Sequence, residues 1–200
     1  MISIKNHFGI VILAGGESSR LGSPKQLLVY RNKTLLRHAV LTALEANCGP
    51  VMVVTGANFS AVEKELIELP VEIVHNNDWQ EGMASTLRKG LSAMLLNHPE
   101  TDGIIFMVCD QPFVTKSHLL CLIDRHRQKG KPIAASCYNG QAGTPAFFHQ
   151  SYFKRLMELK GDKGARTLIA GQPEDVERVE FEQGAIDIDT KEDYERLLKV

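Results

Sequence analysis

A glycine-rich stretch near the N-terminus combines residue types suited to holding phosphate. An apolar, β-branched run over residues 10–13 leads into Gly15 and Gly16, and the polar segment that follows contains Arg20 and Lys25. Glycines after a buried strand let backbone N–H groups approach a phosphate closely. An arginine adds forked donors, and a lysine adds a point charge. The stretch therefore predicts a site for a nucleoside triphosphate.

The spacing of these glycines differs from two familiar phosphate loops. A P-loop needs G-x-x-x-x-G-K-[ST], but Gly16 and Gly22 stand six positions apart and Ser23 follows Gly22. The dinucleotide-binding turn G-x-G-x-x-G is not formed by residues 15–18, and the acidic residue that would bind a ribose is missing. A plain strand–helix connection with a solvated arginine and lysine is the alternative interpretation.

Two further stretches offer carboxylates that could bind a metal ion. Asp110 directly follows an apolar run over residues 104–109, so its side chain projects from the end of a predicted strand. Asp187 and Asp189 alternate, which places both on one side of an extended chain. Carboxylates suit Mg²⁺, and we favour Asp110 and Asp189 as ligands, with Asp187 second. The alternatives are a turn or cap role for Asp110 and a helix-cap role for Asp189.

A fourth stretch, residues 76–91, joins a loop to a predicted helix. Gly82 precedes the helix and leaves backbone donors free for a base or a phosphate, while Ser85 and Arg88 share one helix face. Trp79 is equally consistent with a lid over a ligand and with a core residue.

Hydrophobic periodicity predicts the elements that must position these stretches. Strands are expected over residues 9–13, 51–55, 71–74, 103–108 and 133–136. Helices are expected over residues 34–46, 59–69, 83–96 and 116–129. This alternation predicts a three-layer, Rossmann-like α/β fold, with a mostly parallel sheet between two helical layers. Because ligands bind at the carboxyl ends of such strands, the glycine-rich stretch and residues 76–79, 109–112 and 142–145 should meet at one edge.

The alternation changes near residues 133–148, where an antiparallel excursion is expected. Asn139-Gly140 is typical of a tight hairpin turn. Helical patterns follow over residues 151–159 and 164–170, then a short edge strand over 176–180 and a closing helix over 191–198. We expect residues 1–200 to form one domain.

Composition excludes several classes of protein. The net charge of −1 gives no general attraction to nucleic acid or to an anionic membrane. The four cysteines are widely separated and form no C-x-x-C pair, which argues against a thiolate metal site or a disulfide framework. With no signal-peptide pattern and no apolar run long enough to cross a bilayer, we expect a cytoplasmic protein.

Taken together, the motifs resemble a known family. The pattern L-A-G-G-x-S-S-R-L-G-x-x-K is similar to the signature of the MobA-like nucleotidyltransferase superfamily. Further pieces resemble the molybdenum cofactor cytidylyltransferases (the MocA-like branch) and the molybdenum hydroxylase accessory proteins. These pieces are NNDWQEGMASTLRKGL, VCDQPFVT, YNGQAGTPAFF, LKGDKGAR and IDIDTKEDYERL, and they span nearly the whole chain.

The resemblance implies a nucleotide-diphospho-sugar transferase-like fold and Mg²⁺-dependent transfer of a nucleotide, with CTP favoured, to the phosphate of molybdopterin, releasing pyrophosphate. Lys25, Arg20 and Asp110 would be catalytic, and Asp110 and Asp189 would bind Mg²⁺. The nucleotide would be bound by Leu13, Ala14, Gly15, Gly16, Ser18, Ser19, Arg20, Lys25, Gly82 and Ser85. The acceptor would be bound by Gly143, Thr144, Asp162 and Arg166.

Three alternatives stay open at this point. The Ala14-Gly15-Gly16 stretch is similar to guanylyl-transferring relatives, whereas many cytidylyl-transferring ones carry a second alanine, so GTP competes with CTP. Another phosphorylated acceptor, such as a sugar phosphate, is the second alternative. The third is a non-catalytic accessory protein that binds the finished cofactor, with a molybdenum hydroxylase as its partner.

Overall fold

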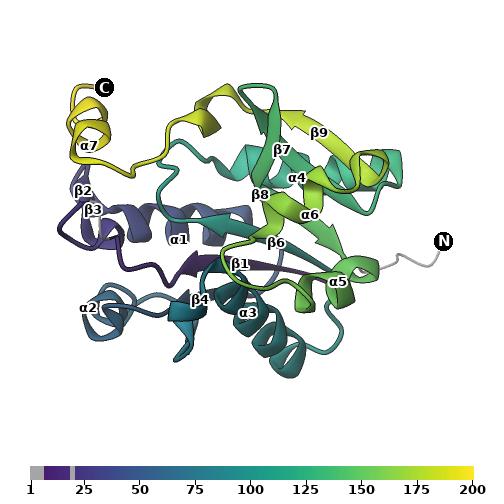
Figure 1. Cartoon of the computed structure of the whole chain (residues 1–200), viewed down its shortest axis with the longest axis horizontal. Helices are drawn as coiled ribbons and strands as arrows, with labels where there is room; N and C mark the ends of the chain where they lie inside the picture. The colour runs from purple at the N-terminus through teal and green to yellow at the C-terminus, as the bar shows by residue number, and fades with distance from the viewer. Residues whose placement is uncertain (1–6, 19–20) are drawn as a thin grey trace.

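A seven-stranded sheet forms the centre of the protein (Figure 1). The computed structural model describes residues 7–18 and 21–200. The strand order is β5-β4-β1-β6-β8-β7-β9. The strands are β1 Phe8–Ala14, β4 Val51–Thr55, β5 Glu72–His75, β6 Gly103–Val108, β7 Ile133–Tyr138, β8 Gln141–His149 and β9 Val176–Glu180.

The direction of the strands confirms a mostly parallel sheet with an antiparallel excursion. β1 is parallel to β4 and β6, β4 to β5, and β7 to β9, while β8 runs antiparallel to both β6 and β7. The turn between β7 and β8 is formed by Asn139 and Gly140, with φ angles of 50° and 70°. Asparagine and glycine tolerate this left-handed conformation, as the tight hairpin turn requires.

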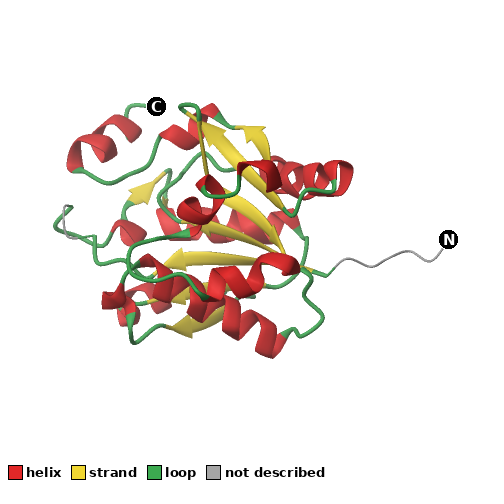
Figure 2. Ribbon diagram, turned by 45° about the vertical axis from the view of Figure 1, so that its right-hand side comes forward, coloured by secondary structure: helices red, strands yellow, loops and turns green. Residues whose placement is uncertain are grey.

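Helices cover both faces of the sheet, which confirms the three-layer prediction (Figure 2). One face packs against α1 Leu35–Ala46, α2 Phe59–Lys64 and α4 Lys116–Lys129. The other packs against α3 Met83–Asn97, α5 Phe153–Met157 and α6 Ala165–Ala170.

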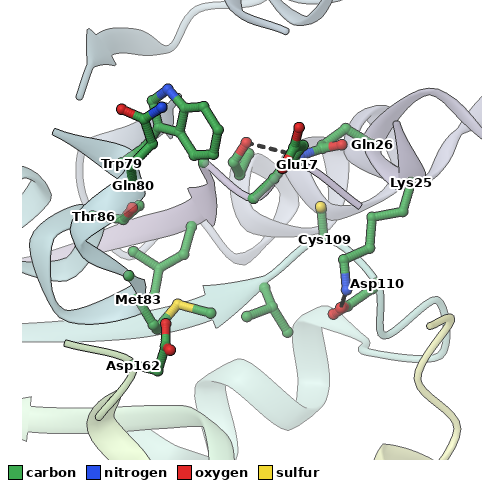
Figure 3. A pocket seen from close by; sticks show the side chains of 16 residues that line it. Glu17, Lys25, Gln26, Trp79, Gln80, Met83, Thr86, Cys109, Asp110 and Asp162 are labelled. Carbon is green, nitrogen blue, oxygen red and sulfur yellow. Dashed lines mark hydrogen bonds and ion pairs between the residues drawn. The ribbon is translucent and has the colours of Figure 1, made fainter. Parts of the chain in front are cut away.

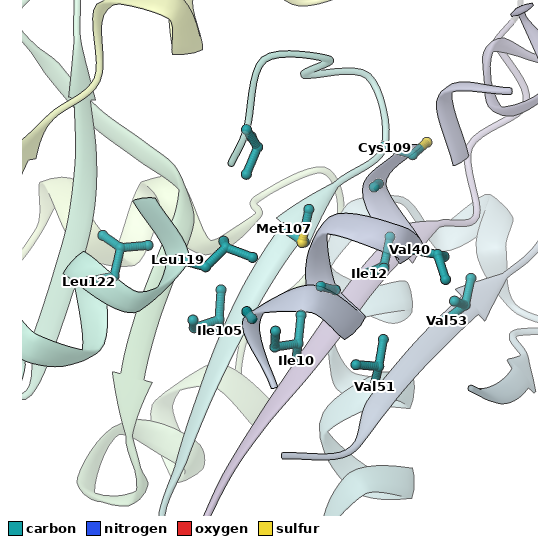
Figure 4. Close-up of a cluster of buried hydrophobic side chains, with 14 of the residues drawn as sticks. Ile10, Ile12, Val40, Val51, Val53, Ile105, Met107, Cys109, Leu119 and Leu122 are labelled. Atoms are coloured by element: carbon teal, nitrogen blue, oxygen red, sulfur yellow. The ribbon is translucent and has the colours of Figure 1, made fainter. Parts of the chain in front are cut away.

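Alternating side chains of β1 supply both cores. Ile10 and Ile12 belong to the cluster that includes Val40 of α1 (Figure 4), whereas Val11 and Leu13 point into the opposite cluster. Because successive residues of a strand face opposite sides of the sheet, a fully apolar strand is buried on both faces. None of the helices in the described part of the chain is long and apolar enough to cross a bilayer.

Several short elements differ from the sequence-based expectation. β2 Val29–Tyr30 and β3 Lys33–Thr34 form a small ribbon, and α7 Lys191–Leu197 closes the chain beside it. Two-residue strands are too short to show alternation, so periodicity could not reveal them. The helix expected over residues 59–69 ends at Lys64. The 3₁₀ turns are η1 Lys25–Leu27, η2 Trp79–Glu81, η3 Gln150–Tyr152, η4 Pro173–Asp175 and η5 Glu182–Ala185.

Gly90 sets how closely α3 approaches the sheet, and α3 carries Gly82 at its start. A Cβ added at Gly90 would lie 2.6 Å from Cγ1 of Val11 and 2.7 Å from Cγ2 of Val54. Both distances are too short for carbon–carbon contact, so α3 or the two strands would have to move apart.

Replacing Gly90 with alanine should therefore destabilise the protein. Helix propensity alone favours alanine by about 1 kcal/mol, but overpacking a core typically costs about 1–3 kcal/mol. We expect Gly90→Ala to lower the free energy of unfolding in urea. Lys89→Ala, an exposed neighbour on the same helix, should change it by no more than about 0.5 kcal/mol. An increase in stability for Gly90→Ala would contradict the close approach.

Candidate active site

A cavity of about 310 Å³ lies at the carboxyl ends of β1 and β6 (Figure 3). Its walls come from the glycine-rich loop, from η1, from the start of α3 and from the end of β6. It brings together eight of the residues that the resemblance assigned to the nucleotide, the metal or the acceptor. These are Leu13, Ala14, Gly15, Gly16, Lys25, Gly82, Asp110 and Asp162. The remaining lining residues are Glu17, Gln26, Trp79, Gln80, Met83, Thr86, Val108 and Cys109.

The glycine-rich loop keeps its carbonyl groups bound inside the protein. The carbonyl oxygen of Gly15 accepts a hydrogen bond from the Ala57 N–H at 3.1 Å. Those of Ala14 and Gly16 accept from the side chain of Gln26. Among the described residues, the backbone N–H groups of Gly15, Gly16 and Glu17 donate to no protein group. The loop therefore offers donors, not acceptors, to a ligand.

Lys25 binds two carboxylates that are distant in sequence. Its Nζ contacts the carboxylate of Asp110 and lies 2.8 Å from Oδ1 of Asp189. The Lys25 and Asp110 side chains are only 20% and 12% exposed. Burial alone would lower the pKa of Lys25, but the two carboxylates outweigh it and hold that pKa above its usual range. The ammonium group is therefore charged at neutral pH.

Helix capping does not explain either carboxylate. The N-cap of α4 is Thr115, whose side chain accepts from the His118 N–H, so Asp110 does not cap that helix. The N-cap of α7 is Thr190, which forms a capping box with Asp193. The helix-cap interpretation of Asp189 is therefore wrong, because Thr190 caps the helix.

A buried backbone contact brings Asp189 to the cavity edge. The Ile188 N–H donates to the Asp110 carbonyl at 3.1 Å, and the Ile188 side chain is completely buried beside α7. These two contacts fix the backbone between Asp187 and Asp189. Burial, and then repulsion by Asp189 and Asp110, raises the pKa of Asp187 above its usual value. The edge therefore has more negative charge than Lys25 alone neutralises.

The carboxylates have the chemistry of a hard-cation site. Oδ1 of Asp110 is buried and has no hydrogen-bond partner among the described residues, although a buried polar atom normally has one. Residues 7–18 and 21–200 contain no cluster of three or more side chains able to ligate a metal. A cation held here would therefore take two carboxylates and complete its shell with phosphate oxygens and waters, as Mg²⁺ commonly does.

The environment of the cysteine beside Asp110 disfavours its reactive, ionised form. Cys109 is buried in the cavity wall. Burial, reinforced by the negative charge of Asp110, raises its thiol pKa to about 12. A raised pKa disfavours the thiolate, which is the nucleophilic form of cysteine, so no covalent role is assigned to Cys109.

The segment before α3 contacts the loop before α6, and this brings residues of the two predicted ligand sites together. Gly82 has φ +100°, and a Cβ there would lie 2.4 Å from Oδ1 of Asp162. The acceptor candidate Asp162 therefore sits over the nucleotide candidate Gly82. Ser85 is buried beneath the same segment, where its hydroxyl donates to the Asp78 carbonyl at 2.8 Å and accepts from Asn76. Its hydroxyl is thus engaged within the protein.

Other predicted residues lie elsewhere or outside the described chain. Arg166 donates to Oε1 of Gln141 at 2.6 Å and lines a separate cavity of about 230 Å³ beside α6. Gly143 packs against the ring of Tyr138, and neither it nor Thr144 lines the main cavity. Ser18 accepts from the Lys25 N–H at 3.0 Å, which ties the loop to η1. Ser19 and Arg20 lie outside the described residues.

Sequence reasoning missed Gln26 as a member of the site. It directly follows Lys25 in the sequence, but a glutamine normally faces solvent. In the structure it is 1% exposed. Only the tertiary fold shows that its partners are two loop carbonyls.

Known proteins match nearly the whole chain. The model of the MobA-like NTP transferase domain matches residues 10–178. The nicotine blue oxidoreductase of Paenarthrobacter nicotinovorans is 33% identical, covering 94% of this chain and 95% of its own length. The molybdenum cofactor cytidylyltransferase of Escherichia coli and a probable molybdenum cofactor guanylyltransferase of Bacillus mycoides are each 24% identical. The cytidylyltransferase match covers 92% of both chains, and the guanylyltransferase match covers 94% of both.

Solved structures are also similar to nearly the whole chain. The crystal structure of Rv0371c from Mycobacterium tuberculosis has a TM-score of 0.85 and 33% identity, covering 98% of each chain. A complex of Rv0371c with manganese has a TM-score of 0.81 and 31% identity, covering 97% of this chain and 99% of the other. A nucleotidyl transferase from Methanothermobacter thermautotroptrophicus (Mth528) has a TM-score of 0.81 at 23% identity, covering 97% of each chain, so the fold is one that nucleotidyltransferases have.

The double contact of Lys25 predicts competition with a metal ion. Without nucleotide, its ammonium occupies the two carboxylates that a cation would use. We expect Lys25→Met to bind Mn²⁺ roughly tenfold more tightly or better, because an ion pair near a surface is worth a few kcal/mol. Calorimetric titration without nucleotide measures this.

Two controls make the comparison specific. Lys89→Met removes an exposed charge from α3 and should leave the affinity for Mn²⁺ unchanged. Adding Asp110→Asn to Lys25→Met should abolish the gain. Weaker Mn²⁺ binding in Lys25→Met would show that Lys25 does not compete with the metal.

Proposed function

Because the chain belongs to the MobA-like NTP transferase family, we propose that it transfers a nucleotide from an NTP to the phosphate of a molybdopterin-type acceptor, releasing pyrophosphate. CTP is the favoured donor, Mg²⁺ is the favoured metal, and residues 1–200 act as one catalytic domain. One observation carries the proposal. The loop N–H groups and the Asp110 oxygen that have no partner in the described part of the chain, together with the charged Lys25, belong to residues that line a single cavity.

The reaction requires no general base from the protein. An oxygen of the acceptor phosphate forms a bond to the α-phosphorus, and the bond from that phosphorus to the bridging oxygen breaks as pyrophosphate leaves. The second pKa of a phosphate monoester is about 6, so the attacking oxygen is already ionised at neutral pH. The protein acts by positioning the reactants and by stabilising the charge that develops.

The described residues suit these tasks. The N–H groups of Gly15, Gly16 and Glu17 would bind phosphate oxygens, and the Lys25 ammonium would move from the carboxylates to the α-phosphate. Asp110 and Asp189 would hold Mg²⁺, which supplies a Lewis acid that neutralises phosphate charge. The buried Gln26 and Ile188 anchor the loop and the acidic segment from behind.

The choice between CTP and GTP rests on the two loop glycines. A Cβ at Gly15 would lie 2.8 Å from Oγ1 of Thr86, whereas a Cβ at Gly16 would point into open space. An alanine is therefore accommodated at position 16 as the loop stands, and at position 15 only if Thr86 moves. Gly15→Ala and Gly16→Ala, compared for kcat/KM with CTP and with GTP, would show which position selects the base.

Lys25→Ala and Asp110→Ala should each lower kcat by about 10²–10³, since one stabilising contact to a developing charge is worth roughly 3–4 kcal/mol. Pyrophosphate release with a molybdopterin acceptor measures this. Asp124→Ala, on the exposed surface of α4, is the matched control and should retain wild-type turnover. Near-normal turnover of either cavity variant would refute the proposed mechanism.

Nucleotide binding can be separated from turnover by thermal shift. CTP, GTP, ATP and UTP are compared with and without Mg²⁺. A ligand at about 100 Kd stabilises a protein by about 2.7 kcal/mol, and we expect the largest Mg²⁺-dependent shift with CTP. A shift without pyrophosphate release would favour the non-catalytic accessory role at a molybdenum hydroxylase. No shift with any nucleotide would contradict an NTP site.

A further inference from the structure

Gln26 is a buried amide whose hydrogen bonds all lead to the glycine-rich loop. Its Nε2 donates to the carbonyl oxygens of Ala14 at 3.0 Å and Gly16 at 2.8 Å. Its Oε1 lies 3.5 Å from the hydroxyl of Ser18. An amide with 1% exposure is costly unless its polar atoms are paired. Both amide protons are used, so the loop and Gln26 hold one another in a defined conformation.

These bonds determine which way the loop peptides point. In a planar trans peptide the C=O and N–H groups point in opposite directions. The Ala14 and Gly16 carbonyls point to Gln26, so the N–H groups of Gly15 and Glu17 point away from it. The Gly15 carbonyl points to Ala57, which turns the Gly16 N–H away from Ala57. Each bound carbonyl thus leaves one donor for a ligand.

We propose that Gln26 is the positioning residue that keeps the loop in this donor-presenting conformation, a role that rests on the proposed NTP site. Without its two donors, the Gly16 carbonyl has no hydrogen-bond donor left among the described residues, and the Ala14 carbonyl keeps only the place that β1 gives it beside Thr55 of β4. A carbonyl oxygen turned toward a triphosphate would repel it. Glutamate has the right size but no protons to donate, and it adds a negative charge next to the phosphates.

Gln26 also links the loop to the charged centre of the site. It directly follows Lys25 within η1, so one short turn directs an ammonium to Asp110 and an amide to the loop. The Lys25 N–H bonds to Ser18 at 3.0 Å. The spacing between the loop donors and the Lys25 charge is therefore set by adjacent residues of a single turn.

The test uses Gln26→Glu and Gln26→Met, with Gln128→Met on the exposed surface of α4 as the matched control. The probe is inorganic triphosphate in the presence of Mg²⁺, which needs neither a base nor an acceptor. Trp79 is the single tryptophan of the chain and lines the cavity, so its fluorescence reports binding. Losing two hydrogen bonds should weaken triphosphate binding about tenfold or more in Gln26→Met, and further in Gln26→Glu.

A second measurement separates positioning from general damage. Mn²⁺ binding at Asp110 and Asp189 should stay within about threefold of wild type in Gln26→Met, a shift smaller than one hydrogen bond, and the KM for CTP should rise more than kcat falls. Wild-type triphosphate affinity in folded Gln26→Met and Gln26→Glu would overturn the role of Gln26 while leaving the proposed function intact. A wild-type protein that binds neither triphosphate nor CTP would overturn both.

Discussion

The contact of one ammonium group with two carboxylates organises the site. Lys25 joins η1, the end of β6 and the segment before α7, three parts of the chain that are far apart in sequence. Such a contact is strong only where water is partly excluded, as it is here. It is also incomplete, because one positive charge faces two negative ones and an oxygen of Asp110 has no described partner. The described side chains therefore give this point a net negative charge, whereas a phosphate bound there would need positive charge.

The sheet brings the charged side chains of the site to one edge, and buried contacts fix their positions there. Parallel strands end at one edge, so the loops after β1, β5 and β6 meet there regardless of their separation in sequence. Ile188 then fixes the acidic segment through its buried side chain and its N–H bond to the Asp110 carbonyl. Gly82 allows the segment at Asp162 to lie against α3. A change at Ile188 or Gly82 would therefore shift the backbone that carries Asp189 and Asp162, and with it the position of their carboxylates.

Much of this could be predicted from residue patterns. Apolar runs located the strands, Asn139-Gly140 located the hairpin, and the strand-end rule located Asp110 and Gly82 at a common edge. These signals are local, so one sequence is enough to find them. The topology of the sheet follows from the same alternation of strands and helices, since right-handed crossovers leave few arrangements.

Side-chain partners could not be predicted in the same way. The sequence favours Asp189 as a metal ligand with helix capping as the alternative, and capping is ruled out by Thr190, which forms the cap itself. Asp162 and Arg166 stand four residues apart, yet they line different cavities because α6 begins between them. No pattern in the sequence singles out Gln26. In each case the deciding contact is tertiary and has no periodic signal.

The balance of charge in the cavity connects metal and nucleotide binding. Its described lining includes Glu17, Asp110 and Asp162 against the single cation Lys25, while Arg20 lies outside the described residues. The loop adds neutral N–H donors, which orient phosphates but do not cancel their charge. A bare triphosphate would therefore meet repulsion that a metal-bound one would not. Because coupling between two ligands is reciprocal, nucleotide would raise the affinity for metal as much as metal raises the affinity for nucleotide. The release of Lys25 from its carboxylates would then accompany the arrival of both.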